Sequence, residues 1–129
     1  VWRVLLDFPH YPDWNPFVVR IEGEAEVGAR LHVSLRTQDG RQYRFRPGVL
    51  QVTPPIVLRW LGHLVVPGVL DGEHGFFLDP LPGGGTRFRQ EERFQGLLAP
   101  LLWRRLEAVT AAGFEAFNTA LKQRAESGK

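Results

Sequence analysis

Apolar and polar residues alternate along much of the chain before residue 96. Between residues 30 and 37, for example, Leu31, Val33 and Leu35 would share one face of a strand, while His32 and Ser34 would share the other. A period of two is the pattern of a strand with one buried face. Six segments of this kind predict six strands: Phe17–Gly23, Arg30–Thr37, Arg41–Val52, Ile56–Leu64, Asp71–Pro80 and Thr86–Phe94.

Both ends of the chain have helical patterns. Trp2–Phe8 is typical of the end of an amphipathic helix, and Tyr11–Phe17 of a proline-rich turn or one-turn helix. From Leu97 to about Glu126 the apolar period becomes that of an α-helix, and a helix of about 30 residues is about 45 Å long. Its apolar face would contain Leu102, Leu106, Val109, Thr110, Gly113, Phe114, Phe117, Ala120 and Leu121. Glycine in mid-helix is unfavourable, so Gly113 indicates a bend or a close approach.

The order of these elements predicts an α+β fold with helices on one face of the sheet. We expect one domain over residues 1–129, in which about six antiparallel strands curve around the long C-terminal helix. A short N-terminal helix precedes the strands. A strongly curved sheet under a single helix leaves a hollow. We therefore expect an apolar cavity between the sheet and the C-terminal helix.

Composition narrows the range of partners. Sixteen lysines and arginines against fourteen acidic residues give a formal net charge of +2. Nucleic-acid-binding proteins more often carry a concentrated basic stripe, so we expect no nucleic-acid partner. A solvated sheet face explains the outward arginines Arg41, Arg44, Arg46, Arg87, Arg89 and Arg93 better.

The absence of cysteine excludes disulfides and thiolate nucleophiles. It also fits a reducing compartment, so we expect a cytoplasmic location. No apolar run approaches the roughly 18 residues of a membrane span, so we expect no transmembrane segment.

One strand carries polar residues on the face that should be buried. The odd positions of residues 86–94 are charged, so the even positions, which include Gln90 and Glu92, should face inward. A loop at residues 81–85 would then place Leu78 opposite Phe88, Phe76 opposite Gln90 and His74 opposite Glu92. An inward histidine–carboxylate pair suits proton transfer, but it can also orient a ligand or satisfy its own hydrogen bonds. We favour the ligand-orienting role and keep His74 and Glu92 as candidates for catalysis.

Aromatic residues are numerous for so small a core. Packing explains each of them singly, but as a set they favour an aromatic-lined pocket. The predicted ligand-binding residues are Trp14, Trp60, His74, Phe76, Phe88, Gln90, Glu92, Thr110, Phe114 and Phe117. No histidine pair at metal-binding spacing is readable, and the only serines are Ser34 and Ser127. We therefore expect no metal, no cofactor and no serine nucleophile.

Several segments resemble the START/SRPBCC superfamily, and within it the polyketide cyclase/dehydrase-like proteins. They are Trp2-Arg-Val-Leu-Leu-Asp-Phe8, Tyr11-Pro-Asp-Trp-Asn-Pro-Phe17, Leu58-Arg-Trp60 with Gly62, Gly72-Glu-His-Gly-Phe76, Gly85-Thr-Arg-Phe-Arg-Gln-Glu-Glu-Arg-Phe94-Gln-Gly96 and Phe117-Asn-Thr-Ala-Leu-Lys122. The resemblance covers nearly the whole chain and implies a helix-grip fold.

The resemblance also implies three possible functions. The first is binding of a small hydrophobic or aromatic molecule, lipid-like or polyketide-like, in the cavity. The second is a cyclase or dehydratase in which His74 and Glu92 transfer protons, and the third is a surface-mediated chaperone partner. Members of this superfamily carry a strand before the first helix, and this sequence shows none. The resulting sheet edge could pair with another copy as a dimer.

Overall fold

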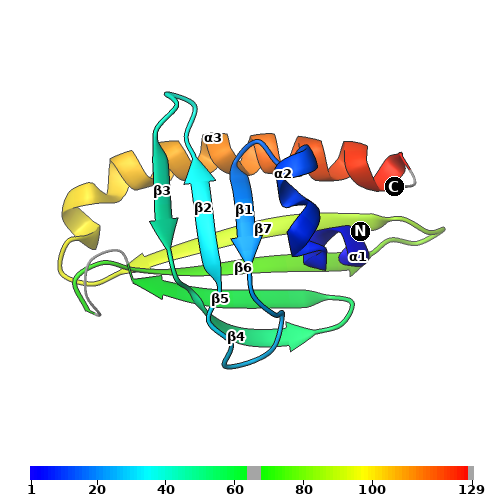
Figure 1. The fold of residues 1–129 in the computed structure, drawn as a ribbon, viewed down its shortest axis with the longest axis horizontal. Helices are drawn as coiled ribbons and strands as arrows, with labels where there is room; N and C mark the ends of the chain where they lie inside the picture. The colour runs from blue at the N-terminus through cyan, green and yellow to red at the C-terminus, as the bar shows by residue number, and fades with distance from the viewer. Residues whose placement is uncertain (64–67, 128–129) are drawn as a thin grey trace.

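The computed structural model describes residues 1–63 and 68–127 (Figure 1). Short helical segments come first: α1 (Trp2–Leu6), η1 (Phe8–His10) and α2 (Tyr11–Trp14). The described strands are β1 (Val18–Glu22), β2 (His32–Arg36), β3 (Gln42–Phe45), β4 (Gly48–Thr53), β5 (Val57–His63), β6 (Asp71–Pro80) and β7 (Thr86–Gln95). The long helix α3 (Ala99–Glu126) follows them. The α+β architecture expected from the sequence is confirmed.

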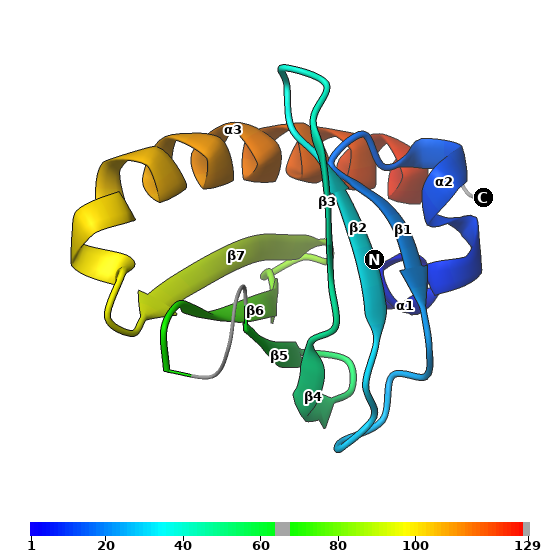
Figure 2. The same cartoon turned by 60° about the vertical axis from the view of Figure 1, so that its left-hand side comes forward.

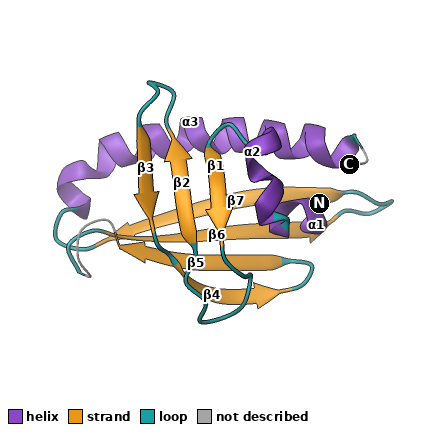
Figure 3. Cartoon of the chain, viewed as in Figure 1, coloured by secondary structure: helices purple, strands orange, loops and turns teal. Residues whose placement is uncertain are grey.

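The strands form two antiparallel sheets, ordered β1-β2-β3 and β4-β5-β6-β7. The sequence predicts one strand over residues 41–52, but the structure divides this segment at Pro47 into β3 and β4. Pro47 has no N–H to donate to a ladder, while its carbonyl accepts a hydrogen bond from Leu31 N at 2.9 Å. The chain changes sheet at this point, and Figure 3 shows the two sets of strands running in different directions.

The β6–β7 hairpin has the register that the sequence predicts. Leu78 pairs with Phe88, Phe76 with Gln90 and His74 with Glu92. The β6–β7 and β5–β6 ladders make up most of the larger sheet. The predicted end of the β5 segment at Leu64 lies outside the described residues, and β5 ends at His63.

Helix α3 faces both sheets. Figure 2 shows β7 running beneath the helix, with the strands of the small sheet in front of it. The helix begins at Ala99 and not at Leu97, because the backbone N–H groups of Leu97 and Leu98 donate to the carbonyls of Gly68 and Val69 at 3.1 and 2.9 Å.

Gly113 is a point of close approach between the helix and the small sheet. A Cβ there would lie 2.3 Å from Cε1 of Phe17, a distance at which two carbon atoms overlap. The sequence predicts either a bend or a close approach at Gly113, and the structure has the close approach.

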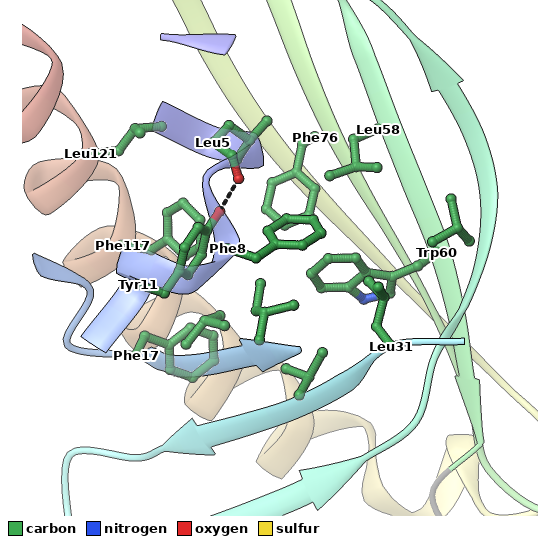
Figure 4. Close-up of a cluster of buried hydrophobic side chains, with 14 of the residues drawn as sticks. Leu5, Phe8, Tyr11, Phe17, Leu31, Leu58, Trp60, Phe76, Phe117 and Leu121 are labelled. Atoms are coloured by element: carbon green, nitrogen blue, oxygen red, sulfur yellow. Dashed lines mark hydrogen bonds between the residues drawn. The ribbon is translucent and has the colours of Figure 1, made fainter. Parts of the chain in front are cut away.

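The N-terminal segments seal one end of the molecule with aromatic side chains. Figure 4 shows Phe8, Tyr11, Phe76 and Phe117 gathered beside α1 and α3, with the Tyr11 hydroxyl donating to the Leu5 carbonyl at 2.5 Å. Burial, and then the nearby Asp7 carboxylate, raises the pKa of the Tyr11 hydroxyl well above its ordinary value. At this end of the molecule Leu5, Phe8, Tyr11 and Phe117 are all buried in one hydrophobic cluster.

Each of the two strand orders has two ends, so β1, β3, β4 and β7 each pair with one neighbouring strand within the described residues. On the β7 side, helix α3 packs against the strand.

Candidate functional site

A cavity of about 320 Å³ lies between the N-terminal half of α3 and the inner faces of the two sheets. Its walls are mostly apolar. The lining residues are Phe17, Val18, Leu35, Thr37, Tyr43, Phe45, Trp60, Gly62, Gly72, His74, Glu92, Phe94, Leu102, Arg105, Leu106, Val109, Thr110 and Phe114. A volume near 300 Å³ is at the lower end of the range for small-molecule sites.

Two glycines opposite each other leave part of this space open. Gly62 on β5 pairs with Gly72 on β6. A Cβ at Gly62 would lie 3.0 Å from the Phe45 ring, and one at Gly72 would lie 2.7 Å from Glu92 Oε1. The absence of side chains at these positions therefore makes room for both an aromatic wall and a carboxylate.

His74 and Glu92 lie in contact in the cavity wall, with His74 Nδ1 2.8 Å from Glu92 Oε2. Both are well shielded from solvent, with side-chain exposures of 8% and 14%. The imidazole also packs against aromatic rings, since its centroid lies 4.3 Å from that of Phe76 and 4.8 Å from that of Phe114. Burial and ring packing fix the pair in one orientation.

Gln90 completes a hydrogen-bond chain behind the cavity. Its Oε1 lies 2.8 Å from His74 Nε2, and its Nε2 donates to Asn118 Oδ1 on α3 at 2.7 Å. In this arrangement Gln90 presents its carbonyl oxygen to His74, so the imidazole Nε2 donates to Gln90. The network thus links the imidazole on β6 to helix α3 through Gln90 and Asn118.

Glu92 Oε1 is the atom of this network that remains for a ligand. Oε2 lies 2.8 Å from His74 Nδ1, whereas Oε1 has no hydrogen-bond partner within the described part of the chain, and Glu92 lines the cavity. The arrangement can accept a hydrogen bond, or a proton, from a molecule in the cavity.

The structure brings five of the ten predicted site residues into the cavity wall, namely Trp60, His74, Glu92, Thr110 and Phe114. Gln90 reaches the site only through His74.

The remaining four, Trp14, Phe76, Phe88 and Phe117, do not line the cavity and belong to the aromatic core. The Phe117 ring lies 5.8 Å from Trp14, 5.6 Å from Phe76 and 6.0 Å from Phe88, measured between centroids. Strand alternation turns Phe76 and Phe88 inward as predicted, but they lie further along the hairpin, beneath the packed half of α3.

Sequence reasoning missed the contribution of the small sheet. Phe17, Val18, Leu35, Tyr43 and Phe45 line the cavity. The period-two pattern placed Leu35 on a buried face, but it carried no information on which part of the core would be empty.

Arg105 on α3 also lines the cavity, although the helical pattern assigns it to the polar face. It is exposed and contributes the only lysine or arginine among the lining residues. A long side chain at the edge of a helix face can reach a cavity mouth while its charge stays in water.

No cluster of three or more His, Cys, Asp or Glu side chains suited to a metal ion occurs in residues 1–63 and 68–127. His63 Nδ1 instead lies 2.6 Å from Asp71 Oδ1. None of the helices that the structure describes is both long and apolar enough to cross a membrane.

Solved structures with the same fold have low sequence identity to this chain. The di-domain ARO/CYC StfQ from the steffimycin biosynthetic pathway matches with a TM-score of 0.62 at 15% identity, covering 97% of this chain and 46% of StfQ. Protein NE0264 from Nitrosomonas europaea matches with a TM-score of 0.68 at 18% identity, covering 99% of this chain and 87% of NE0264. Protein SA2116 from Staphylococcus aureus, of unknown function, gives 0.63 at 12%, covering 98% and 85%.

These matches confirm the helix-grip fold, and this chain spans less than half the length of the di-domain StfQ. No sequence among the curated proteins matches the chain. The family model described as polyketide cyclase/dehydrase and lipid transport matches residues 1–126. The description of this family supports a ligand-binding or cyclase role. The chain therefore belongs to the polyketide cyclase/dehydrase and lipid transport family.

Proposed function

We propose that the protein binds one small, largely apolar molecule that carries a hydroxyl or another hydrogen-bond donor. The observation that supports this most directly is the free Oε1 of Glu92 in the wall of an otherwise apolar cavity. Apolar burial would supply most of the affinity, at roughly 25 cal/mol per Å². The hydrogen bond to Glu92 would select the orientation.

The cavity volume and wall limit the ligand class. About 320 Å³ accommodates a small fused-ring aromatic or a short acyl chain. Trp60 and Phe114 present aromatic surface, which favours a planar aromatic body. Arg105 at the exposed edge would suit a negative group at the outer end of a longer ligand.

Binding of 2-naphthol and naphthalene, followed by fluorescence, tests both parts of this proposal. Hydrogen bonds to charged groups contribute about 1.5–3 kcal/mol, so 2-naphthol should bind at least about tenfold more tightly. Glu92→Gln, which keeps the shape and removes the charge, should reduce this preference to a few-fold. An unchanged preference would contradict the orienting role of Glu92.

A cavity-filling variant tests the location. Thr110→Trp should abolish binding of both compounds, whereas Ala111→Trp, one residue along the helix on an exposed position, should leave binding intact. Equal affinity in the two variants would place the ligand outside the cavity. Native mass spectrometry of the purified protein would reveal a ligand already carried.

A second candidate function is catalysis of a cyclisation, favoured by the contact between Glu92 and His74. Glu92 Oε1 would remove a proton from a carbon flanked by carbonyls, and the resulting enolate carbon would bond to a second carbonyl carbon. The proton would then return to the new alkoxide oxygen, so the step balances without a cofactor. His74 would hold the carboxylate in position.

His74→Ala and Glu92→Gln should each abolish turnover of a poly-β-ketone substrate in a protein that stays folded by circular dichroism. Activity that survives both substitutions would exclude this assignment. A folded, active binding protein without turnover would leave the first function standing.

A further inference from the structure

The arginines on the outer faces of the two sheets differ in how many acidic side chains lie beside them. On the larger sheet, Arg59 forms an ion pair with Glu73, and Arg89 Nε lies 3.0 Å from Asp79 Oδ2. Arg89 also contacts Glu91 at 3.0 Å and lies over the Phe77 ring. Arg59 and Arg89 are thus compensated, as expected for a solvated sheet face, whereas Arg87 and Arg93 on β7 form no ion pair within the described residues.

The outer face of the small sheet concentrates arginines around one hydroxyl. Arg20 pairs with Ser34, and Ser34 pairs with Arg44, so the three residues form one row across β1, β2 and β3. Arg36 follows Ser34 by two positions and therefore lies on the same face. Neighbouring strands are about 4.8 Å apart, which places these guanidinium groups within reach of a single bound group.

These residues form one side of a groove of about 600 Å³, which we call the arginine groove. Its lining residues are Pro12, Asp13, Trp14, Asn15, Pro16, Val19, Arg20, Ser34, Arg36, Gln42 and Arg44. The backbone N–H of Arg36 donates to the Phe17 carbonyl at 2.8 Å, which holds the arginine row against the segment of residues 12–16. One wall is thus basic and the other mostly apolar.

The positive charge of the arginine groove is only partly compensated. Arg20 Nε lies 2.5 Å from Glu22 Oε1, and Asp13 is the acidic residue of the opposite wall. Arg36 and Arg44 form no ion pair with any residue that the structure describes. Like charges side by side on one sheet face are destabilising, so a bound anion would relieve a repulsion that the fold itself leaves in place.

A buried donor without a partner belongs to the same groove. Asn15 is 4% exposed, and its Oδ1 accepts hydrogen bonds from Phe17 N and Val18 N at 3.0 and 2.9 Å. Its Nδ2 has no hydrogen-bond partner in the described part of the chain. Buried amides are nearly always satisfied, so an acceptor from outside these residues, a water or a ligand oxygen, is expected here.

We propose that the arginine groove binds a phosphate group, either as a free phosphate or phosphomonoester or as the headgroup of a phospholipid. Guanidinium groups bind phosphate oxygens with paired, charge-assisted hydrogen bonds, and the Ser34 hydroxyl adds a further donor. A phosphate dianion matches several arginines better than a single carboxylate does. On the outer face of the larger sheet, Glu73, Asp79 and Glu91 interrupt the basic residues, so an extended nucleic acid is disfavoured.

The arginine groove lies across the small sheet from the ligand cavity. Leu35 and Tyr43 line the cavity, whereas their neighbours Ser34 and Arg44 line the groove. The two sites share the same strands but none of their lining residues. The proposal is therefore independent of the ligand proposed for the cavity.

Titration with inorganic phosphate at constant ionic strength, with chloride as the balancing anion, tests the site by amide chemical shifts. Saturable shifts are expected at Ser34, Arg36 and Arg44. The exposed double substitution R36Q/R44Q should weaken the apparent affinity at least about tenfold. Arg87→Gln, which removes an exposed charge from β7, should change it by less than about twofold.

Phosphatidylcholine vesicles with and without phosphatidic acid distinguish the two sources of phosphate. Vesicle binding that requires phosphatidic acid and is lost in R36Q/R44Q would identify the lipid headgroup. Saturable binding of inorganic phosphate alone would identify a soluble anion. Equal shifts with chloride, or equal weakening by R36Q/R44Q and R87Q, would mean an adventitious ion only and would overturn the proposal, as would binding of RNA without binding of phosphate.

Discussion

The two halves of helix α3 have the same amphipathic pattern but meet very different surroundings. In the C-terminal half, Phe117 is fully buried and Leu121 nearly so. In the N-terminal half, Leu101 is 80% exposed and Trp103 50% exposed, and the inward residues Leu102 and Leu106 face the cavity. One continuous helix therefore closes a solid core at one end and covers a hollow at the other.

The difference comes from what lies opposite each half. The N-terminal segments of residues 2–14 pack against the C-terminal half and fill it with aromatic rings, so that Tyr11 and Trp14 both contact Phe117. No described segment fills the space opposite Leu106. The comparison indicates that helical periodicity specifies which face is buried, whereas the neighbouring elements decide whether that face is packed or left open.

The largest effect should come from removing the central ring of the packed half. Phe117→Ala should lower the free energy of unfolding by about 3–5 kcal/mol, because truncating a buried phenylalanine leaves a void among fixed neighbours. Urea denaturation followed by tryptophan fluorescence measures the change.

The matched substitution in the open half is Leu106→Ala, which should cost only about 1–2 kcal/mol, because it enlarges a space that already exists. Equal losses from the two variants would show that the halves are packed alike and would contradict the comparison.

A smaller effect is expected at the boundary between the halves. Gly113→Ala would gain about 1 kcal/mol of helix propensity, but overpacking costs about 1–3 kcal/mol. Because the added methyl would lie 2.3 Å from the Phe17 ring, we expect the cost to exceed the gain and thermal stability to fall.

Combining Gly113→Ala with Phe17→Leu should recover part of the loss, giving a double-mutant cycle with a coupling of about 0.5–3 kcal/mol. Strict additivity of the two substitutions would show that the ring and the helix do not restrict each other. A gain in stability from Gly113→Ala alone would show the same.

The smallest effect concerns the rim of the open half, which is held by polar contacts. Asp71 Oδ1 lies 2.6 Å from His63 Nδ1, and the carboxylate also accepts from Gly68 N. The hydrogen bond from His63, followed by that from Gly68, lowers the pKa of the Asp71 carboxyl.

A carboxyl whose pKa is lower in the folded state stabilises the fold above its unfolded pKa of about 4 and loses this contribution as pH falls through the folded value. Asp71→Asn should therefore lower the melting temperature at pH 7, and the gap to the parent protein should close below about pH 4. Glu115→Gln, on an exposed turn of α3, serves as the control. A gap that stays constant with pH would contradict the role of the Asp71 charge.

Much of the fold was predictable because short stretches of the sequence indicate the strands, the helices and the turns between them. The alternation in residues 86–94 and the length of the loop before it were enough to pair His74 with Glu92 correctly. The division of residues 41–52 was not predictable to the same degree. Pro47 is readable as a kink, but the change of sheet depends on its contact with Leu31, a residue distant in sequence.

The site was predicted less completely, for a physical reason. Inward-facing polar residues stand out in a sequence, and His74 and Glu92 do line the cavity. An aromatic residue that fills a core and one that lines a hollow have the same pattern. Phe117 is packed in the core because the N-terminal segments lie opposite it. Phe114 lines the cavity because they do not extend that far.

The glycine pair in the cavity wall couples two properties of the site. A methyl group at Gly72 would take up ligand space and would also displace the Glu92 oxygen that lies 2.7 Å from the Cβ position. The size of the acceptable ligand and the placement of its polar group are therefore not separately adjustable at this residue. A family member with a larger side chain there would have to change its ligand's shape and its hydrogen-bonding end in the same step.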